Sequence, residues 1–90
     1  MSTSHVTVRF WAAARSAAGV DHDDLPVEGP VTLAEVVRRV VDAHPNARLA
    51  GVLEVCSVLV GDWPVTTEDP AEVEIRPGDE VQFLPPFAGG

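Results

Sequence analysis

Apolar and polar residues alternate near the start of the chain. Every second residue from Val6 to Phe10 is apolar, and the residues between them are polar. This period of two is typical of a β-strand with one buried face, and it puts Trp11 on the opposite face. The alanine-rich residues 12–18 follow, and we expect the chain to reverse direction at Gly19.

A second, shorter strand is expected around Leu25 and Val27. Pro26 lies between them and has no N–H group to donate to a neighbouring strand. The strand therefore belongs at an edge of the sheet.

The clearest helix begins at Thr32. Glu35 follows three residues later, as in a capping box, and Val31 and Val36 have the spacing of a hydrophobic staple. The helix should end at His44-Pro45, because the residue before a proline is disfavoured in the helical conformation. Apolar residues recur on one face, which we expect to pack on the sheet: Leu33, Val36, Val37, Val40 and Val41.

The second half of the chain contains shorter elements. We expect Asn46 to cap a turn of helix that carries Leu49, Val52 and Leu53. Residues 56–60 form a short apolar run that predicts a buried strand ending at a turn, and residues 63–66 predict a brief return strand. Gly61-Asp62 is the turn between these two strands, and an irregular acidic segment follows at residues 67–74. The turn Pro77-Gly78-Asp79 then leads into the last strand, at residues 80–84. Strands packed on one main helix predict an α+β roll.

The chain ends in an unusual segment. Pro85 and Pro86 can neither donate to a β-ladder nor continue into a helix, so we expect a stiff extension away from the domain. The glycines lack a Cβ atom and can enter a channel too narrow for ordinary side chains. We therefore predict a folded domain at residues 1–84 and an extended tail at 85–90, whose last residues are Phe87, Ala88, Gly89 and Gly90.

The tail presents the α-carboxylate of Gly90. A carboxylate reacts with nucleophiles only after activation, and an acyl adenylate would make it an electrophile for sulfur or amine nucleophiles. Gly90 is therefore the predicted reacting residue, and the unbranched Gly89-Gly90 end offers a nucleophile the least obstruction.

The charge of the chain narrows the choice of partners. Fourteen acidic residues against six basic ones give a formal charge of −8, and every basic residue is arginine. Such a chain repels phosphate backbones, which argues against nucleic acid and favours a partner with a basic docking surface. Without lysine the chain offers no side-chain amine for conjugation. No apolar run approaches the about 20 residues of a membrane span and no signal-peptide pattern is present, so we expect no membrane association and a cytoplasmic location.

Several other residues carry chemistry in other proteins. Cys56 is interpreted as a core residue rather than a sulfur-relay thiol, since it is the first residue of an apolar strand. Residues 21–24, Asp-His-Asp-Asp, are interpreted as a solvated acidic loop, because nothing elsewhere fixes the geometry of a metal site. His5, His22 and His44 are scattered and lack a nucleophile at a recognisable spacing, so we expect no catalytic triad.

Isolated glycines, tryptophans and arginines say less about the function. Four glycines are interpreted as turn residues rather than a phosphate loop: Gly29, Gly51, Gly61 and Gly78. Trp11 and Trp63 are either core lids or part of a docking surface. Arg9 and Arg15 could contact an activating enzyme, but ordinary solvent-facing charges are favoured.

The C-terminal sequence resembles the MoaD group of the MoaD/ThiS sulfur-carrier family. The similar segment is Pro77-Gly78-Asp79-Glu80-Val81-Gln82-Phe83-Leu84 followed by Pro85-Pro86-Phe87-Ala88-Gly89-Gly90. Val8-Arg9-Phe10 with residues 12–15 is similar to the family's first strand and loop, and Thr32-Leu33 to its helix start. The resemblance spans nearly the whole chain and is most specific in the tail.

This resemblance implies a β-grasp, ubiquitin-like roll, with a mixed sheet packed on one main helix. It also implies that a MoeB-like adenylyltransferase uses ATP and Mg²⁺ to adenylate Gly90, and that a sulfurtransferase or persulfide source converts the adenylate to a thiocarboxylate. The tail, with Phe87 as apolar anchor, would then enter a MoaE-like large subunit of molybdopterin synthase and give sulfur to cyclic pyranopterin monophosphate. No cofactor would be bound by the chain itself, and it would not be an enzyme alone.

Two alternatives remain open on the sequence. The chain could carry sulfur for thiazole, cysteine or a specialised metabolite instead. It could also be a ubiquitin-like interaction module whose tail is inert or becomes conjugated to proteins.

Overall fold

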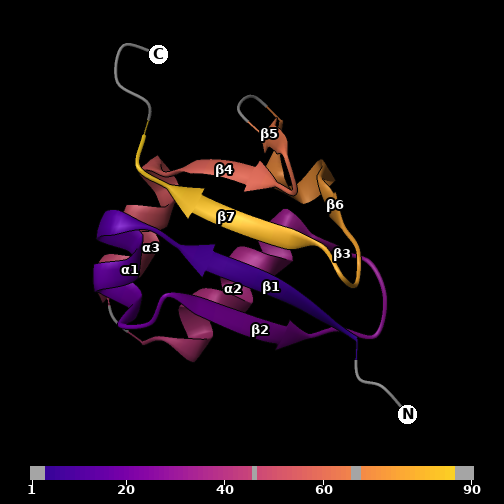
Figure 1. The fold of residues 1–90 in the computed structure, drawn as a ribbon, viewed down its shortest axis with the longest axis horizontal. Coiled ribbons are helices and arrows are strands. Elements are labelled where there is room, and N and C mark those ends of the chain that lie inside the picture. Colours follow the sequence, from indigo (N-terminus) through magenta and orange to yellow (C-terminus); the bar gives the residue numbers. More distant parts are fainter. Residues whose placement is uncertain (1–3, 46, 66–67, 87–90) are drawn as a thin grey trace.

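Strand β7 (Glu80–Leu84) lies in the middle of the structure (Figure 1). The computed structural model describes residues 4–45, 47–65 and 68–86. Within these segments, five strands form a sheet in the order β2-β1-β7-β4-β5, with bounds β1 His5–Phe10, β2 His22–Pro26, β4 Ser57–Val60 and β5 Trp63–Val65. A separate pair joins β3 (Val31–Thr32) to β6 (Glu74–Ile75).

The sheet is mixed, as predicted. β7 runs parallel to β1, with Phe10 opposite Phe83, and antiparallel to β4, with Ser57 opposite Leu84. A parallel pair needs a crossover between its strands, and here nearly the whole chain forms that crossover. The first and last strands of the chain are therefore neighbours.

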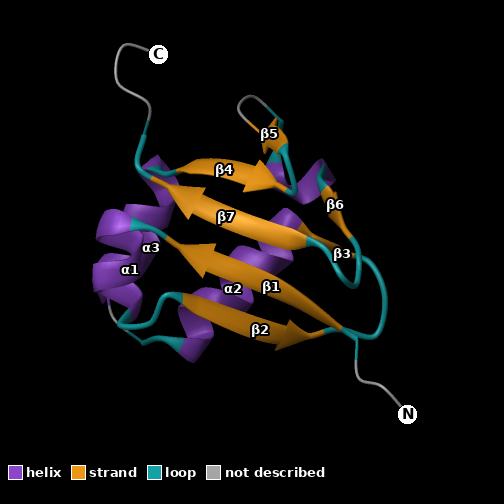
Figure 2. Ribbon diagram, in the orientation of Figure 1, coloured by secondary structure: helices purple, strands orange, loops and turns teal. Residues whose placement is uncertain are grey.

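Helices cover one face of this sheet (Figure 2). They are α1 (Ala12–Ala18), α2 (Leu33–Ala43) and α3 (Ala47–Val55), with a 3₁₀ turn η1 at Pro70–Glu72. None of the helices in the described segments is long and apolar enough to cross a lipid bilayer. This architecture is the β-grasp that the resemblance implied; the described segments contain three α-helices, where one main helix was expected.

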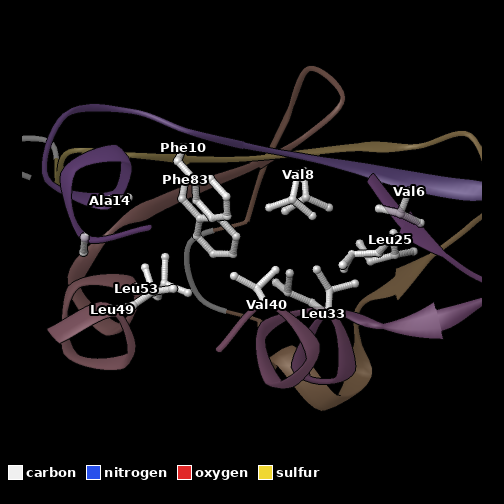
Figure 3. Close-up of a cluster of buried hydrophobic side chains, with 14 of the residues drawn as sticks. Val6, Val8, Phe10, Ala14, Leu25, Leu33, Val40, Leu49, Leu53 and Phe83 are labelled. Carbon is white, nitrogen blue, oxygen red and sulfur yellow. The ribbon is translucent and has the colours of Figure 1, made fainter. Parts of the chain in front are cut away.

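The core lies between the sheet and the helices, and the alternation read from the sequence places its side chains. Val6, Val8 and Phe10 of β1 are all buried, and Phe10 stacks on Phe83 of β7 with ring centroids 6.2 Å apart. Figure 3 shows these rings projecting from the sheet toward the helices. Buried helical residues belong to the same cluster: Ala14, Ala17, Leu33, Val36, Val40, Leu49 and Leu53.

Helix α2 follows its predicted start and end. The Thr32 hydroxyl accepts a hydrogen bond from the Glu35 backbone N–H at 3.0 Å, and His44 is the C-terminal cap before Pro45. The Glu35 carboxylate binds the guanidinium groups of Arg38 and Arg39 at 2.6 and 2.8 Å. Hydrogen bonds from Arg38 and then Arg39 hold the pKa of Glu35 below its usual value. The hydrogen bond from the Glu35 N–H to the Thr32 hydroxyl, which is half of the expected capping box, is therefore present. The Glu35 carboxylate instead pairs with the two arginines on the surface of the helix.

Residues 12–18, for which no helix was predicted, form helix α1. Gly19, where the chain was expected to reverse, ends this helix with φ 81° and donates its N–H to the Arg15 carbonyl oxygen. Alanine has the highest helix propensity, and glycine adopts this left-handed cap without a Cβ clash. Gly51 lies inside α3 and is not a turn residue.

The acidic loop predicted at residues 21–24 was also wrong, because β2 begins at His22. Pairing with β1 places Asp24 opposite Thr7 and Asp23 opposite Val8. Tertiary pairing overrides the weak local strand preference of aspartate. The predicted edge position of this strand is confirmed.

Both outer strands of the sheet contain a proline. Pro26 lies in β2 and Pro64 lies in β5. Proline cannot donate to a ladder, so it hinders a further strand from adding at either edge. Some predicted features lie outside the described residues: the Asn46 cap, the end of the return strand at Thr66, and the start of the acidic segment at Thr67.

The Phe10–Phe83 stack should dominate the stability of the sheet. Phe83→Ala should lower the free energy of unfolding by about 3–5 kcal/mol, since it leaves a cavity in the core. Phe83→Leu should lower it by about 1–2 kcal/mol and keep the domain folded. Urea denaturation measures both. Val55→Ala, at a side chain that is 62% exposed, is the control; a loss in Phe83→Ala no larger than in this control would contradict the assignment.

The Thr32 cap gives a second stability prediction. Thr32→Ala should lower the free energy of unfolding by about 1 kcal/mol, because the Glu35 N–H loses its acceptor. Thr32→Ser keeps an oxygen at the cap and should retain most of the stability in thermal or urea denaturation. Equal stability of the alanine and serine variants would show that the hydroxyl does not stabilise the helix.

Candidate functional site

The end of β7 is held firmly on both of its sides. On one side the Trp11 backbone N–H donates to the Phe83 carbonyl oxygen at 3.0 Å. On the other side Leu84 pairs with Ser57 of β4. Because β7 is a central strand, a force on the residues that follow is resisted by two ladders instead of one.

The chain leaves the sheet after Leu84. Pro85 and Pro86 are exposed and lie outside any strand or helix. Neither has an N–H group, so the ladder cannot continue through them. Four predicted site residues lie outside the described part of the chain: Phe87, Ala88, Gly89 and Gly90. The described site is therefore the root of the predicted tail.

Trp11 lies beside this root, where β1 ends and α1 begins. Its side chain is 47% exposed, and its indole Nε1 donates to Gln82 Oε1 at 3.1 Å. The next residue, Ala12, has φ 49°, which is uncommon for a residue with a Cβ atom. Trp11 was expected either to cover the core or to belong to a docking surface; it is the N-cap residue of α1 with an exposed ring, which excludes the first alternative.

The other predicted surface residues have different surroundings. Arg9 binds Glu80 at 2.6 Å on the outer face of the sheet, and this hydrogen bond and charge raise the pKa of Arg9. Arg15 lines a small hollow of about 120 Å³ together with Trp11 and Asp21. Trp63 is 71% exposed on β5 and pairs with Val60, at the end of β4 opposite to Ser57. Both tryptophans are therefore surface residues rather than core lids.

The acidic residues near β2 bind protein groups. Asp23 Oδ2 lies 2.5 Å from His44 Nε2, and Asp24 accepts a hydrogen bond from Thr7. Asp21 bonds the ring of His22, and this contact holds the pKa of Asp21 below its usual value. Among the described residues, no three histidine, cysteine or carboxylate side chains are grouped as metal ligands.

Cys56 connects α3 to β4. It is half-buried and packs against the core, in agreement with the interpretation as a core residue. Burial raises the pKa of its thiol, which reduces the thiolate fraction available for nucleophilic attack. It also lines a pocket of about 470 Å³, together with Leu53 of α3 and Phe83 of β7.

Sequence reasoning missed Gln82 as a partner of Trp11. The two residues are 71 positions apart, and only the parallel pairing of β1 with β7 brings them together. The alternation in each strand could have indicated that both lie on the outer face, but not which strands are neighbours.

Comparisons with known proteins agree with this architecture. The model of the ThiS family matches residues 8–90. The molybdopterin synthase sulfur carrier subunit of Aspergillus niger is 33% identical over 91 residues, which cover all of both chains. The solution structure of the Haloferax volcanii HVO 2177 protein has a TM-score of 0.76 and 27% identity, covering 98% of this chain and 88% of that one.

A second similar structure comes from a complex of subunits 1 and 2 of molybdopterin-converting factor from Helicobacter pylori. It has a TM-score of 0.62 and 22% identity, covering 96% of this chain and 99% of the matched one. At that identity the likeness shows the fold alone. The family match and the full-length relative together show that the chain belongs to the ThiS family.

Proposed function

We propose that the chain is the sulfur carrier subunit of a molybdopterin synthase. The observation that carries this proposal is the relative of that name, which is 33% identical along the whole chain. The position of Pro85 and Pro86 at the end of a central strand suits a tail that enters a partner. The partner we propose is a MoaE-like large subunit, since the similar Helicobacter pylori chain was solved in a complex of subunits 1 and 2 of molybdopterin-converting factor.

The first chemical step would be activation of the Gly90 carboxylate. One carboxylate oxygen attacks the α-phosphorus of ATP, pyrophosphate leaves, and an acyl adenylate forms. A MoeB-like adenylyltransferase would bind the ATP and Mg²⁺ and stabilise the developing charge. The carrier supplies only the carboxylate and a narrow end without side chains at Gly89 and Gly90.

The second step would load sulfur. Sulfide attacks the carbonyl carbon, the bond to the phosphate oxygen breaks, AMP leaves and a thiocarboxylate forms. A persulfide on a sulfurtransferase would first give an acyl disulfide, which a thiol reductant must then cleave. Cys56 of this chain is poorly suited as the relay, since burial raises its pKa.

The third step would transfer the sulfur within the large subunit. The thiocarboxylate sulfur attacks a carbon of cyclic pyranopterin monophosphate that carries an oxygen substituent; the C–S bond forms, the C–O bond at that carbon breaks, and the oxygen leaves with the phosphate or as water. Water then cleaves the acyl–sulfur bond and restores the Gly90 carboxylate. A dithiolene contains two sulfur atoms, so two loaded carriers are consumed for each product molecule.

The carrier's own residues would position the tail rather than catalyse. Pro85 and Pro86 limit the conformations of the tail before binding and so reduce the entropy lost on insertion. Phe87 would bind an apolar site of the partner, and Ala88 keeps the passage narrow. Acid, base and phosphate-binding groups would come from the partners, and the chain would not act as an enzyme alone.

Reconstitution with a defined acceptor tests this function. The chain carrying a thiocarboxylate, prepared by sulfide cleavage of a C-terminal thioester, should form molybdopterin from cyclic pyranopterin monophosphate when mixed with a MoaE-like subunit. A chain lacking Gly90 should form none, since its end falls short of the acceptor by one residue, about 3.5 Å. Product is measured by fluorescence after oxidation.

Cys56→Ser is the matched control, and it should support wild-type product formation. Product formed only with a thiazole synthase, and not with the MoaE-like subunit, would place the carrier in another sulfur pathway. If no acceptor takes sulfur and the chain becomes attached to other proteins, the interaction-module alternative is correct.

A further inference from the structure

An exposed aromatic ring marks the root of the tail. The Trp11 backbone is bonded to Phe83, and Pro85 follows two residues after Phe83. The Trp11 side chain is nevertheless 47% exposed, so the ring is not needed to fill the core. A large apolar surface is thus presented where the chain leaves the sheet.

Two features hold this ring in place. Gln82 Oε1 accepts the indole N–H at 3.1 Å, and Gln82 lies on the central strand opposite Arg9. Ala12 has φ 49°, and it is the sole non-glycine residue with positive φ in the described segments. A residue with a Cβ atom keeps such a conformation only when its surroundings impose it. The backbone beside Trp11 is therefore constrained, and the hydrogen bond to Gln82 orients the exposed indole.

A fixed and exposed tryptophan is well suited to binding another protein. Tryptophan is enriched among the residues that carry most of the energy of protein interfaces. A ring that is already oriented loses less conformational entropy when it is covered. The neighbouring Arg9 is already bound to Glu80, so its guanidinium group is less available to a partner than the exposed indole.

The position of Trp11 indicates which partner covers it. The six tail residues 85–90 span at most about 20 Å when extended. A protein that acts on Gly90 and encloses the tail therefore approaches the surface around the root. We propose that Trp11 is a docking residue for the subunit that receives the tail, and that an apolar pocket of this subunit covers the indole. This inference rests on the proposed sulfur-carrier function.

Binding measurements test the docking role. The dissociation constant of the full chain with a MoaE-like large subunit is measured by calorimetry. Trp11→Ala should weaken binding by about 10- to 100-fold, because the main apolar contact is lost. Trp63→Ala is the matched control, since Trp63 is 71% exposed at the other end of β4, and it should change binding by less than about twofold.

A double-mutant cycle separates positioning by Gln82 from direct contact. Trp11→Phe keeps an aromatic ring but removes the N–H donor, and Gln82→Leu removes the acceptor. Each should weaken binding by about 2- to 10-fold, and the double variant should be no weaker than Trp11→Phe alone. Additive losses would overturn the positioning role of Gln82. Both single variants leave the Trp11 backbone bond to Phe83 intact, and circular dichroism checks their folding.

The inference and the proposed function can fail separately. If Trp11→Ala binds as tightly as the wild type, or Trp63→Ala is weakened equally, Trp11 is not the docking residue even when sulfur transfer occurs. If the wild type binds the large subunit through Trp11 but never transfers sulfur, the proposed function is wrong and the docking role stands.

Discussion

The two-sided hydrogen bonding of β7 is the constraint on which the rest of the structure depends. A strand between β1 and β4 cannot shift its register without disturbing both neighbours. The same register brings Phe83 onto Phe10 inside the domain and Gln82 under Trp11 outside it. The last strand to be synthesised thus closes the core and also fixes the point from which the tail departs.

The two faces of this sheet carry different kinds of side chain. The inner face and the helices form an apolar core that contains no buried charged residue in the described segments. The outer face near the tail root carries Trp11, Gln82 and the Arg9–Glu80 pair. Proline in each edge strand hinders pairing with other sheets. The end of β7, rather than either edge, is therefore the surface where we propose that a partner docks.

Local sequence patterns predicted the elements that they control. Alternation located β1 and β7, and the Thr32 cap with its apolar stripe located α2. The helix α1 was missed because seven residues dominated by alanine show no strong amphipathic period. The start of β2 was missed because pairing with β1, not local preference, extends its polar residues. The Trp11–Gln82 contact depends on strand order, which no local pattern contains.

The tail was predicted from residue chemistry and family resemblance, and the structure shows the strand end from which it leaves the sheet.

We propose that Gly90 carries sulfur as a thiocarboxylate. The most direct test of this claim is the intact mass of the chain after incubation with a cognate adenylyltransferase, ATP and sulfide. We expect exchange of one oxygen for sulfur, located at Gly90 by fragmentation and absent without ATP. An unchanged mass, with no adenylate formed by an adenylyltransferase of proven activity, would contradict the claim.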